Sequence, residues 1–440
     1  MITVTRDTVI PSVNQTLEVL RMHNQLVPQL LDFDKIHQYW AYYQLILRDK
    51  EPELREALRL ASNQQSSYRT YLLSYLIKTG QTAGLEKTKT GYSLDKDSIA
   101  GCIATGMVSE DTVKLLTLFQ EYDSAKRTAG TLLRLLQNPV VDMMSCDKHR
   151  MIYVQPRWEP QNTGRVAMCD PAIQNLPRGI QDIQTVPIRY VLLHTDSGQI
   201  EPRTTYSTFC ADPQIIALIN LYNDAYFGVL HYVTKLTEAD IASGRIDFEK
   251  MEITDEIKNM RQSIKTNNNA VMYGAKSNVK DDPVKAAMIR RIGNHPLRLQ
   301  KIREIETLLD KGIYEFPTAF GTKIDIRNSD KLQSITDPKY YREECIKLAI
   351  NNPIQGTAAD LMRLSVAEAD KLINRKGKKS AIINYVHDAG VFAIHEDDYD
   401  AIADELATIV SYNVPGWIPI TAEPEFTRQA NTNKLFADLY

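Results

Sequence analysis

The sequence predicts an α+β fold with a discontinuous sheet domain. Strand-like apolar runs occur between about residues 150 and 210 and again after residue 380. Between them, apolar residues recur mainly with the spacing of helices. Because strands precede and follow this long helical segment, one sheet is expected to be built from both sides of it.

Length and composition limit the class of protein. A chain of 440 residues is more than one hydrophobic core usually serves, so two or three subdomains are expected. The net charge of −3 means that any nucleic-acid binding has to use a local basic patch. Five widely spaced cysteines without a Cys-x-x-Cys pair indicate neither a zinc site nor a disulfide framework. The sequence shows no secretory signal and no apolar run that could span a membrane, so we expect a cytoplasmic protein.

Helical spacing and end signals predict the elements around the strands. The expected helices cover residues 34–79, 109–137, about 254–273, two segments that flank Pro353, and 398–412. The second begins with a serine and two acids, which favour a helix N-terminus. The third is expected to start at Thr254 and to stop at Gly274. A last strand is expected around residues 418–423.

The stretch NYVHDAGVFAIH, residues 384–395, predicts a β-hairpin with His387 and Asp388 at its tip. A second acid, Asp196, follows the apolar run YVLL after two residues. Two acids that lie just beyond buried strands can hold a pair of divalent cations, which activate an attacking oxygen and stabilise a leaving one. Magnesium prefers such carboxylate oxygens. Taken singly, each acid is more often an ordinary turn residue.

Basic residues gather in the helical segment. Arg261, Lys265, Asn269 and Tyr273 recur every fourth residue, so a helix places them on one side. Arginine and lysine in such a row could grip a triphosphate. Eleven basic residues lie between Lys258 and Arg303. The alternative for both features is a solvated helical face.

Five segments in a fixed order resemble the family A DNA polymerases, those similar to bacterial DNA polymerase I. They are TGRVAMCDPAIQNLPRG (163–179), DSGQIEPR (196–203), RQSIKTNNNAVMYG (261–274), NNPIQGTAADLM (351–362) and YVHDAG (385–390). The resemblance covers about residues 90–440 and implies a right-hand polymerase with an antiparallel-sheet palm, helical fingers and a helical thumb. The implied division is an N-terminal helical region of unknown role (1–85), thumb (86–150), palm (151–212 and 335–440) and fingers (213–334).

The resemblance also implies roles for single residues. The metal ligands would be Asp196, the backbone carbonyl of Ser197, and Asp388, and the catalytic set would be Asp196, Asp388, Arg261 and Lys265. The nucleotide would contact Arg261, Lys265, Tyr273, Gln199, Glu201 and Asn269, with Glu201 as the gate against a ribose 2′-hydroxyl. The DNA would contact Arg165, Gln174, Asn175, Asn351, Gln355, Gly274 and His387.

The implied reaction is primer extension with two Mg²⁺ ions, for which Mn²⁺ can substitute. The implied partners are primer–template DNA and deoxynucleoside triphosphates, with a replication accessory protein as a further candidate, no membrane, and a monomeric state. Only about 85 residues precede the thumb-like segment and they hold no Asp-x-Glu opening of a nuclease site, so we expect no proofreading. The small size favours a phage polymerase, acting in a bacterial or phage-infected cell.

The sequence departs from the family pattern at several positions. Ser197 and Gly198 replace Tyr-Ser, Pro202 replaces Leu, Asn269 replaces an aromatic residue, and Ala389 replaces Glu. Two alternatives therefore stay open: a single-subunit RNA polymerase or primase-like relative, and a catalytically decayed primer–template binding protein. The Gln199-Ile200-Glu201 run favours the DNA polymerase over the first. Retention of both acids argues against the second, since carboxylates near phosphate repel it unless metal is present.

Overall fold

The computed structural model divides the chain into two compact units. The first contains residues 1–29, 155–174 and 185–440, and the second contains residues 30–154 and 175–184. The structure describes residues 1–5, 7–27, 29–60, 67–85, 87–88, 91–104, 106–137, 142–146, 149–154, 157–169, 172–187, 189–234, 246–247, 252–253, 255–272, 283–333, 335–386 and 388–427. Within this described part, no helix combines the length and the apolarity needed to cross a bilayer.

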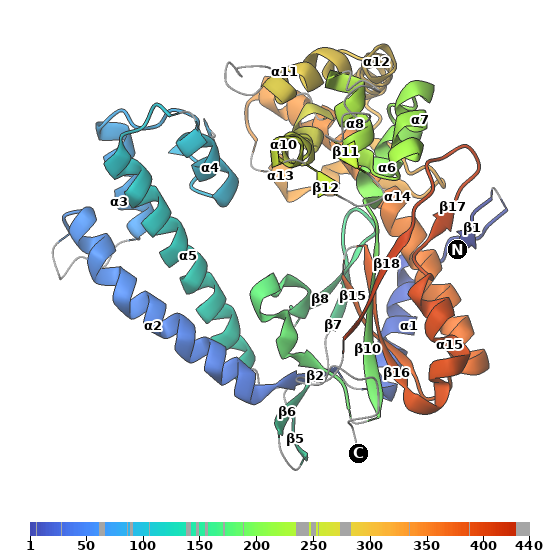
Figure 1. The fold of residues 1–440 in the computed structure, drawn as a ribbon. Coiled ribbons are helices and arrows are strands. Elements are labelled where there is room, and N and C mark those ends of the chain that lie inside the picture. Colours follow the sequence, from blue (N-terminus) through green and yellow to red (C-terminus); the bar gives the residue numbers. More distant parts are fainter. Residues whose placement is uncertain are drawn as a thin grey trace. The chain divides into compact units, whose positions relative to one another are not determined.

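The first unit is built on a four-stranded antiparallel sheet (Figure 1). Its order is β15 (Ala381–Val386), β16 (Ala389–His395), β10 (Tyr190–Ser197) and β18 (Ala422–Thr427). The expected discontinuous sheet is therefore confirmed, because β10 precedes the helical segment and the other three strands follow it. The last strand begins at Ala422, later than expected.

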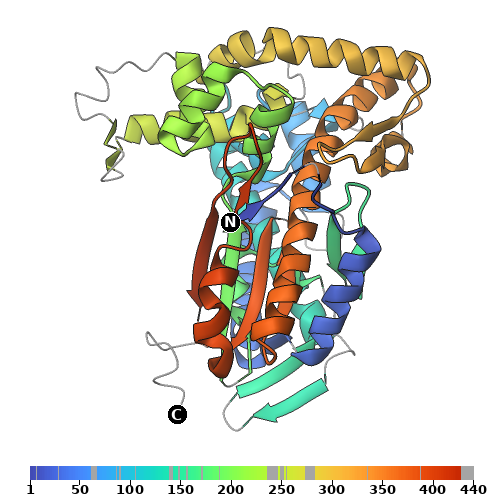
Figure 2. The ribbon, with the colours of Figure 1, turned by 90° about the vertical axis from the view of Figure 1, so that its right-hand side faces the viewer.

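The two faces of this sheet differ, as the alternation of β10 requires. Val191, Leu193, Thr195 and Ser197 are buried, and the residues between them are half-buried. Thr195 donates from Oγ1 to the carbonyl of Ala407 at 2.8 Å, so the buried face meets α15. Three helices lie along the sheet in Figure 2: α1 (Val13–Leu26), α14 (Pro338–Lys376) and α15 (Tyr399–Ala407).

Helices dominate the rest of the first unit. They are α6 (Ile200–Thr208), α7 (Pro213–Tyr222), α8 (Ala225–Thr234), α10 (Asp255–Met272), α11 (Pro283–Met288), a π-helical turn (Ile289–Gly293), α12 (Pro296–Asp310) and α13 (Asp330–Gln333). Phe227, Ile264, Leu348 and Ile354 contribute to their common core. Thr254 and Gly274, the expected ends of α10, lie outside the described residues.

Short two-stranded sheets complete this unit: β1 (Ile2–Thr3) with β17 (Tyr412–Asn413), β7 (Arg157–Pro160) with β8 (Val166–Cys169), β11 (Ile246–Asp247) with β12 (Glu252–Ile253), and β13 (Glu315–Pro317) with β14 (Lys323–Asp325).

The prediction of two helices flanking Pro353 is wrong, because α14 runs through this proline as one helix. A proline inside a helix loses one backbone hydrogen bond and tends to kink or break it. Here Ile350, Ile354 and Ala358 are buried around it. Packing of these side chains outweighs the local cost of the proline.

The second unit is organised around two long helices, α2 (Phe33–Ala57) and α5 (Glu110–Leu136), which pack along each other (Figure 1). Ser109 accepts a hydrogen bond from the backbone of Thr112, so the expected start of α5 is confirmed. The unit also holds α3 (Tyr68–Lys78), α4 (Lys96–Ala104), β3 (Lys87–Thr88) paired with β4 (Gly91–Tyr92), and a sheet ordered β5 (Asp142–Cys146), β6 (His149–Val154), β2 (Gln29–Asp32) and β9 (Gln184–Thr185).

The expected domain boundary at residue 85 stays a prediction, although residues on both sides of it pack together. Leu54 and Leu72, from the region expected to stand alone, share one core with Leu116 and Phe119 of α5. The sequence before residue 85 carries no recognisable motif, so a resemblance based on motifs could not assign it. Burial of α2 against α5 decides its place.

Candidate functional site

Asp196 and Asp388 meet at one end of the central sheet. Asp196 is in register with Ala389, and the backbone N–H of Ser197 donates to the backbone carbonyl of Asp388 at 2.9 Å. Asp388 lies in the tight turn between β15 and β16, and both aspartates are half-buried. Because residues in register on antiparallel strands lie about 5 Å apart, the two acids are neighbours although they are distant in sequence.

These residues fit an oxygen-liganded divalent cation. Two carboxylates and a nearby backbone carbonyl are ligands that Mg²⁺ accepts, with water and substrate phosphate completing the shell. In the described part of the chain, no group of three or more His, Cys, Asp or Glu residues is placed to hold a metal ion. The hydroxyl of Ser197 donates to the carbonyl of Val410 at 2.9 Å, so its side chain belongs to the core.

The substitutions around Asp196 have a structural context. On its other side, Asp196 is in register with Glu423 of β18. A Cβ added at Gly198 would lie 2.8 Å from Oε1 of Glu423, closer than real Cβ contacts. Glycine at position 198 therefore leaves room for the Glu423 carboxylate.

Arg165 and Glu201 form an ion pair. The family resemblance implies different partners for them, DNA for Arg165 and the nucleotide sugar for Glu201. Arg165 follows the β7–β8 turn and Glu201 lies in the first turn of α6. Both residues lie in the first unit, which brings these two predicted site residues together.

The polar residues in the row on α10 differ in how far their side chains are exposed to solvent. Arg261 is half-buried, whereas Lys265 and Asn269 are exposed on the same side. Ile264 and Asn268 lie on the buried side, where Asn268 accepts a 2.7 Å hydrogen bond from the hydroxyl of Tyr206. The row is therefore a solvent-facing surface with one anchored member, Arg261.

Asp224 contacts residues of the candidate site, although no motif of the sequence points to it. It accepts hydrogen bonds from Arg261 Nη2 at 2.6 Å and from Gln199 Nε2 at 2.7 Å. It also caps α8 by accepting from the backbone N–H of Phe227 at 2.8 Å. The sequence could predict that Asp224 caps a helix, since an Asp before an apolar helix is typical of an N-cap. It could not predict that Asp224 contacts α10.

Tyr226 lies beside these groups. Burial raises the pKa of its hydroxyl, and the carboxylates of Asp224, Glu201 and Asp388 raise it further, whereas Arg261 opposes them. The tyrosine therefore stays a neutral hydroxyl at neutral pH. Its ring centre lies 5.3 Å from the Cζ atom of Arg261 on α10.

The remaining residues that the resemblance assigns to DNA or nucleotide binding lie in different environments. Gln174 links two strands by accepting from the backbone N–H of Met168 at 2.8 Å and donating to the carbonyl of Tyr385. Asn175 is exposed at the end of a 3₁₀ turn. Asn351 and Gln355 are half-buried and one turn apart on α14. Three further predicted residues lie outside the described part of the chain: Tyr273, Gly274 and His387.

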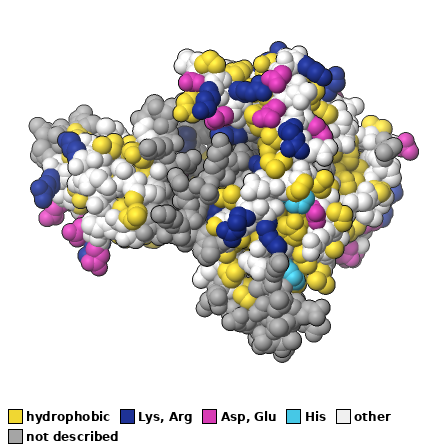
Figure 3. Space-filling view, turned by 90° about the horizontal axis from the view of Figure 1, so that it is seen from above, with side chains coloured by type: hydrophobic (Ala, Val, Ile, Leu, Met, Phe, Trp, Pro, Cys, Tyr) yellow, Lys and Arg dark blue, Asp and Glu magenta, His cyan; other side chains and the backbone are white. Residues whose placement is uncertain are grey.

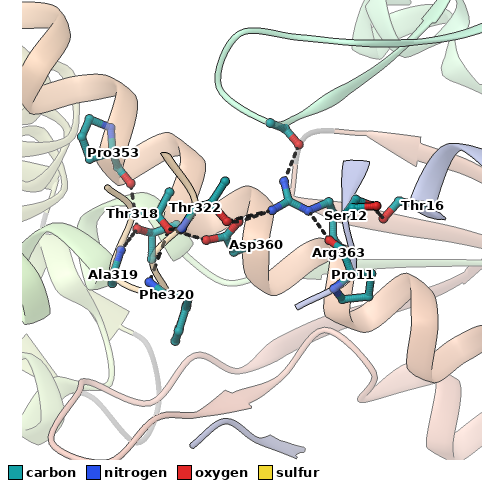
Figure 4. Close-up of polar contacts among 12 residues, drawn as sticks. Pro11, Ser12, Thr16, Thr318, Ala319, Phe320, Thr322, Pro353, Asp360 and Arg363 are labelled. Atoms are coloured by element: carbon teal, nitrogen blue, oxygen red, sulfur yellow. Dashed lines mark hydrogen bonds and ion pairs between the residues drawn. The ribbon is translucent and has the colours of Figure 1, made fainter. Parts of the chain in front are cut away.

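A buried network explains two of the sequence motifs structurally (Figure 4). Arg363 of α14 pairs with Asp360 and donates from Nη1 to the carbonyl of Gly164 at 2.8 Å. Asp360 accepts from the hydroxyls of Thr318 at 2.5 Å and Thr322 at 2.9 Å. The network joins α14 to the β13–β14 hairpin and to the turn that precedes Arg165.

The basic run is less uniform than the sequence suggests. Figure 3 shows Lys and Arg side chains interspersed with Asp and Glu over the helical part of the first unit. Arg298 is buried and donates to the carbonyls of Met272, at 3.0 and 2.9 Å, and Gly293, at 2.5 Å. It provides hydrogen-bond donors for carbonyl groups at helix C-termini, which have no partner within the helix. It is unavailable to bind phosphate.

Comparisons with known proteins agree with these observations. The sequence model of DNA polymerase family A matches residues 46–429, which begins earlier than the resemblance expected. DNA polymerase I of Pseudomonas aeruginosa is 23% identical over 356 residues, covering 77% of this chain and 35% of that protein. DNA polymerase I of Lactococcus lactis subsp. cremoris is 25% identical over 331 residues, covering 72% and 34%. This chain thus spans about a third of the length of these relatives.

A solved structure has the same fold. The polymerase domain of Pol1 from M. smegmatis, in complex with DNA primer-template and dNTP, superimposes with a TM-score of 0.71 at 20% sequence identity. The likeness covers 94% of this chain and 69% of that one. It confirms the expected α+β fold of a polymerase domain. Together with the match to residues 46–429, these findings show that the chain belongs to DNA polymerase family A.

Proposed function

We propose that the protein is a DNA-directed DNA polymerase that extends a primer 3′-hydroxyl with deoxynucleoside triphosphates. One observation carries the proposal: the 2.9 Å bond from the Ser197 N–H to the Asp388 carbonyl, which brings the acids of two separate motifs together. Family membership and the shared fold support it. The chemistry would be in-line attack on the α-phosphate, with pyrophosphate leaving.

Asp196 and Asp388 would hold two Mg²⁺ ions, with the backbone carbonyl of Ser197 as a further ligand. When bound, the ions would supply activation of the attacking hydroxyl and charge stabilisation of the leaving oxygen. Mn²⁺ would substitute because it accepts the same oxygen ligands. Asp196 lies on β10 and Asp388 lies in the turn next to the paired strand β16, so the sheet would hold both acids in position before substrate arrives.

The α10 surface would bind the triphosphate. Arg261 offers a planar fork of donors and Lys265 a compact charge one turn further along. Gln199 and Glu201 would flank the sugar, with Glu201 excluding a 2′-hydroxyl, and Asn269 would lie near the sugar. Tyr273, from the part of the chain that is not described, would complete the nucleotide site.

Primer–template DNA would contact the residues that the family motifs assign to it: Arg165, Gln174, Asn175, Asn351, Gln355, Gly274 and His387. Within the first unit, the sheet with α6, α14 and α15 would be the palm, and helices α7 to α13 would be the fingers. In the second unit, residues 86–150, which include α5, would be the thumb. An accessory protein and a monomeric state stay predictions.

The test is primer extension on a defined DNA template with Mg²⁺, comparing deoxy- and ribonucleotides. Asp196→Asn and Asp388→Asn should each lower kcat by about 10³-fold or more, because loss of a metal ligand removes several kcal/mol of transition-state stabilisation. Primer–template binding should persist in both variants. Glu425→Gln is the matched control, since Glu425 is an exposed acid on β18 in register with His194.

Other outcomes would favour the alternatives. Preferential addition of ribonucleotides would identify an RNA-synthesising relative and refute Glu201 as a gate. A folded wild-type protein that binds primer–template and extends nothing would identify a decayed binding protein.

A further inference from the structure

Asp224 connects two segments that the motifs assign to nucleotide binding. Its Oδ2 accepts from Arg261 on α10 and from Gln199 at the start of α6. Gln199 in turn accepts from the backbone N–H of Ala225 at 2.6 Å through Oε1. The carboxamide and the guanidinium are therefore fixed against one carboxylate.

The contact uses one edge of the guanidinium. Arg261 donates from Nη2 to Oδ2 at 2.6 Å and from Nε to Oδ1 at 3.3 Å, which is a side-on fork. Nη1 donates to no residue in the described part of the chain. Because a guanidinium carries five donors in a fixed plane, the end-on edge remains able to bind phosphate while Asp224 holds the other.

Two aromatic rings restrict the guanidinium further. Its Cζ lies 5.3 Å from the ring centre of Tyr226 and 5.2 Å from that of Phe227. These are cation–π distances. Both rings lie within three residues of Asp224 at the start of α8, so one short segment supplies the carboxylate and both rings.

The backbone of Gln199 adopts an unfavourable conformation. Gln199 adopts the left-handed conformation, with φ of 55° and ψ of 41°, which non-glycine residues rarely occupy. Strain of this kind persists only where surrounding contacts impose it, and it gathers at functional sites. Here the Gln199 side chain donates to Asp224 and accepts from the backbone N–H of Ala225, so both ends of its carboxamide are held at the start of α8.

We propose that Asp224 is a positioning residue for the incoming nucleotide. It holds Arg261 and Gln199 in their binding orientation before the triphosphate arrives, so that binding loses less side-chain entropy. The inference rests on the proposed polymerase function and deepens it. Asp224 itself would not touch the triphosphate, since two anions repel.

The test is steady-state single-nucleotide insertion by wild type, Asp224→Asn, Arg261→Ala and the double variant. Asparagine keeps an acceptor for the α8 cap but loses the charge that grips Arg261. We expect Asp224→Asn to raise KM for the deoxynucleotide about tenfold and to change kcat less than threefold. In the Arg261→Ala background, Asp224→Asn should raise KM by less than a further factor of two, because the arginine that Asp224 positions is absent.

Asp212→Asn is the matched control. Asp212 caps the preceding helix α7 by accepting from Gln214 and Ile215, and it contacts His295 instead of Arg261. Its substitution should leave KM unchanged. Thermal melting of every variant separates loss of fold from loss of positioning.

Each other outcome overturns the inference. A lower KM in Asp224→Asn would mean that Asp224 competes with the triphosphate for Arg261. Additive effects in the double variant would mean that Asp224 acts independently of Arg261. An unchanged KM in Asp224→Asn would mean that Asp224 serves only as the N-cap of α8. If wild type extends no primer, the proposed function fails and this inference fails with it, whereas an active wild type with an unaffected variant removes the inference alone.

Discussion

Arg165 and Glu201 form an ion pair, with only 13% of the Arg165 side chain and 23% of the Glu201 side chain exposed. The pair fixes the carboxylate that is proposed to exclude a ribose 2′-hydroxyl. It also occupies an arginine that the motifs assign to DNA. Selectivity for the sugar and contact with the primer–template are therefore expected to be coupled through one bond.

Glu201→Ala should relax sugar selectivity. Removing one group from a binding pocket changes discrimination about 10- to 100-fold, so the ratio of kcat/KM for ribo- over deoxynucleotides should rise by that factor. Unfolding free energy should fall by about 1–2 kcal/mol, because Arg165 is left partly buried without its partner. Glu159→Ala is the control, since Glu159 pairs with the exposed Arg157. An unchanged ratio would remove Glu201 from the selectivity site.

Gly356→Ala should destabilise the protein despite the higher helix propensity of alanine. The added Cβ would meet Thr318 Cγ2 at 2.8 Å and the carbonyl of Thr163 at 3.2 Å. Overpacking costs about 1–3 kcal/mol, which exceeds the gain of about 1 kcal/mol from replacing glycine in a helix. Gly130→Ala in α5 is the matched control, because nothing lies within 4 Å of its Cβ. We expect urea unfolding to show a higher unfolding free energy for Gly130→Ala and a lower one for Gly356→Ala. If both substitutions changed the unfolding free energy in the same direction, the close packing around Gly356 would be contradicted.

Arg363→Met should cost about 3–5 kcal/mol of unfolding free energy, because it leaves the buried carboxylate of Asp360 without its charge partner. Both side chains are almost fully buried. The double variant Asp360→Asn with Arg363→Met should recover part of this loss, since neither charge then remains. Urea unfolding of the three variants measures the coupling. Equal losses in the single and double variants would argue against a buried ion pair.

The same carboxyl predicts a pH dependence. Burial raises the pKa of Asp360 and outweighs Arg363 and the two threonine hydroxyls, which lower it. An acid with a raised folded-state pKa favours folding below its unfolded pKa of about 3.9, and this contribution is lost as pH rises through the folded pKa. The stability of wild type relative to Asp360→Asn should therefore fall as pH rises from about 4. Urea unfolding between about pH 4 and pH 7 checks the sign, and a rise over that interval would show that Arg363 dominates instead.

Arg298→Leu should reduce stability while leaving DNA binding unchanged. Its guanidinium satisfies the carbonyls of Met272 and Gly293, so its loss leaves buried acceptors unpaired at about 1–3 kcal/mol each. Lys301→Ala, an exposed residue of the same helix, should leave stability nearly unchanged. The salt dependence of primer–template binding separates the roles, because losing a phosphate contact reduces its slope by about one. A reduced slope in Arg298→Leu would return this arginine to the DNA-binding surface.

The sequence by itself determined the class of fold and the location of two acids near strand ends. The apolar run YVLL precedes Asp196, and NYVHDAGVFAIH turns at its centre, so local pattern was sufficient to place Asp196 and Asp388 at strand ends. The four-residue spacing of Arg261, Lys265 and Asn269 likewise defined one side of α10. These features depend on backbone geometry within a single element, which short-range periodicity records.

Only the tertiary structure decided which partners these residues meet. Nothing in the sequence pairs Arg165 with Glu201, or joins Asp224 to Arg261. The continuation of α14 through Pro353 and the packing of α2 on α5 also depend on a core made by distant segments. Local pattern specifies which way a side chain points. The burial of apolar surface against another element decides what that side chain contacts, because its free energy exceeds local preferences.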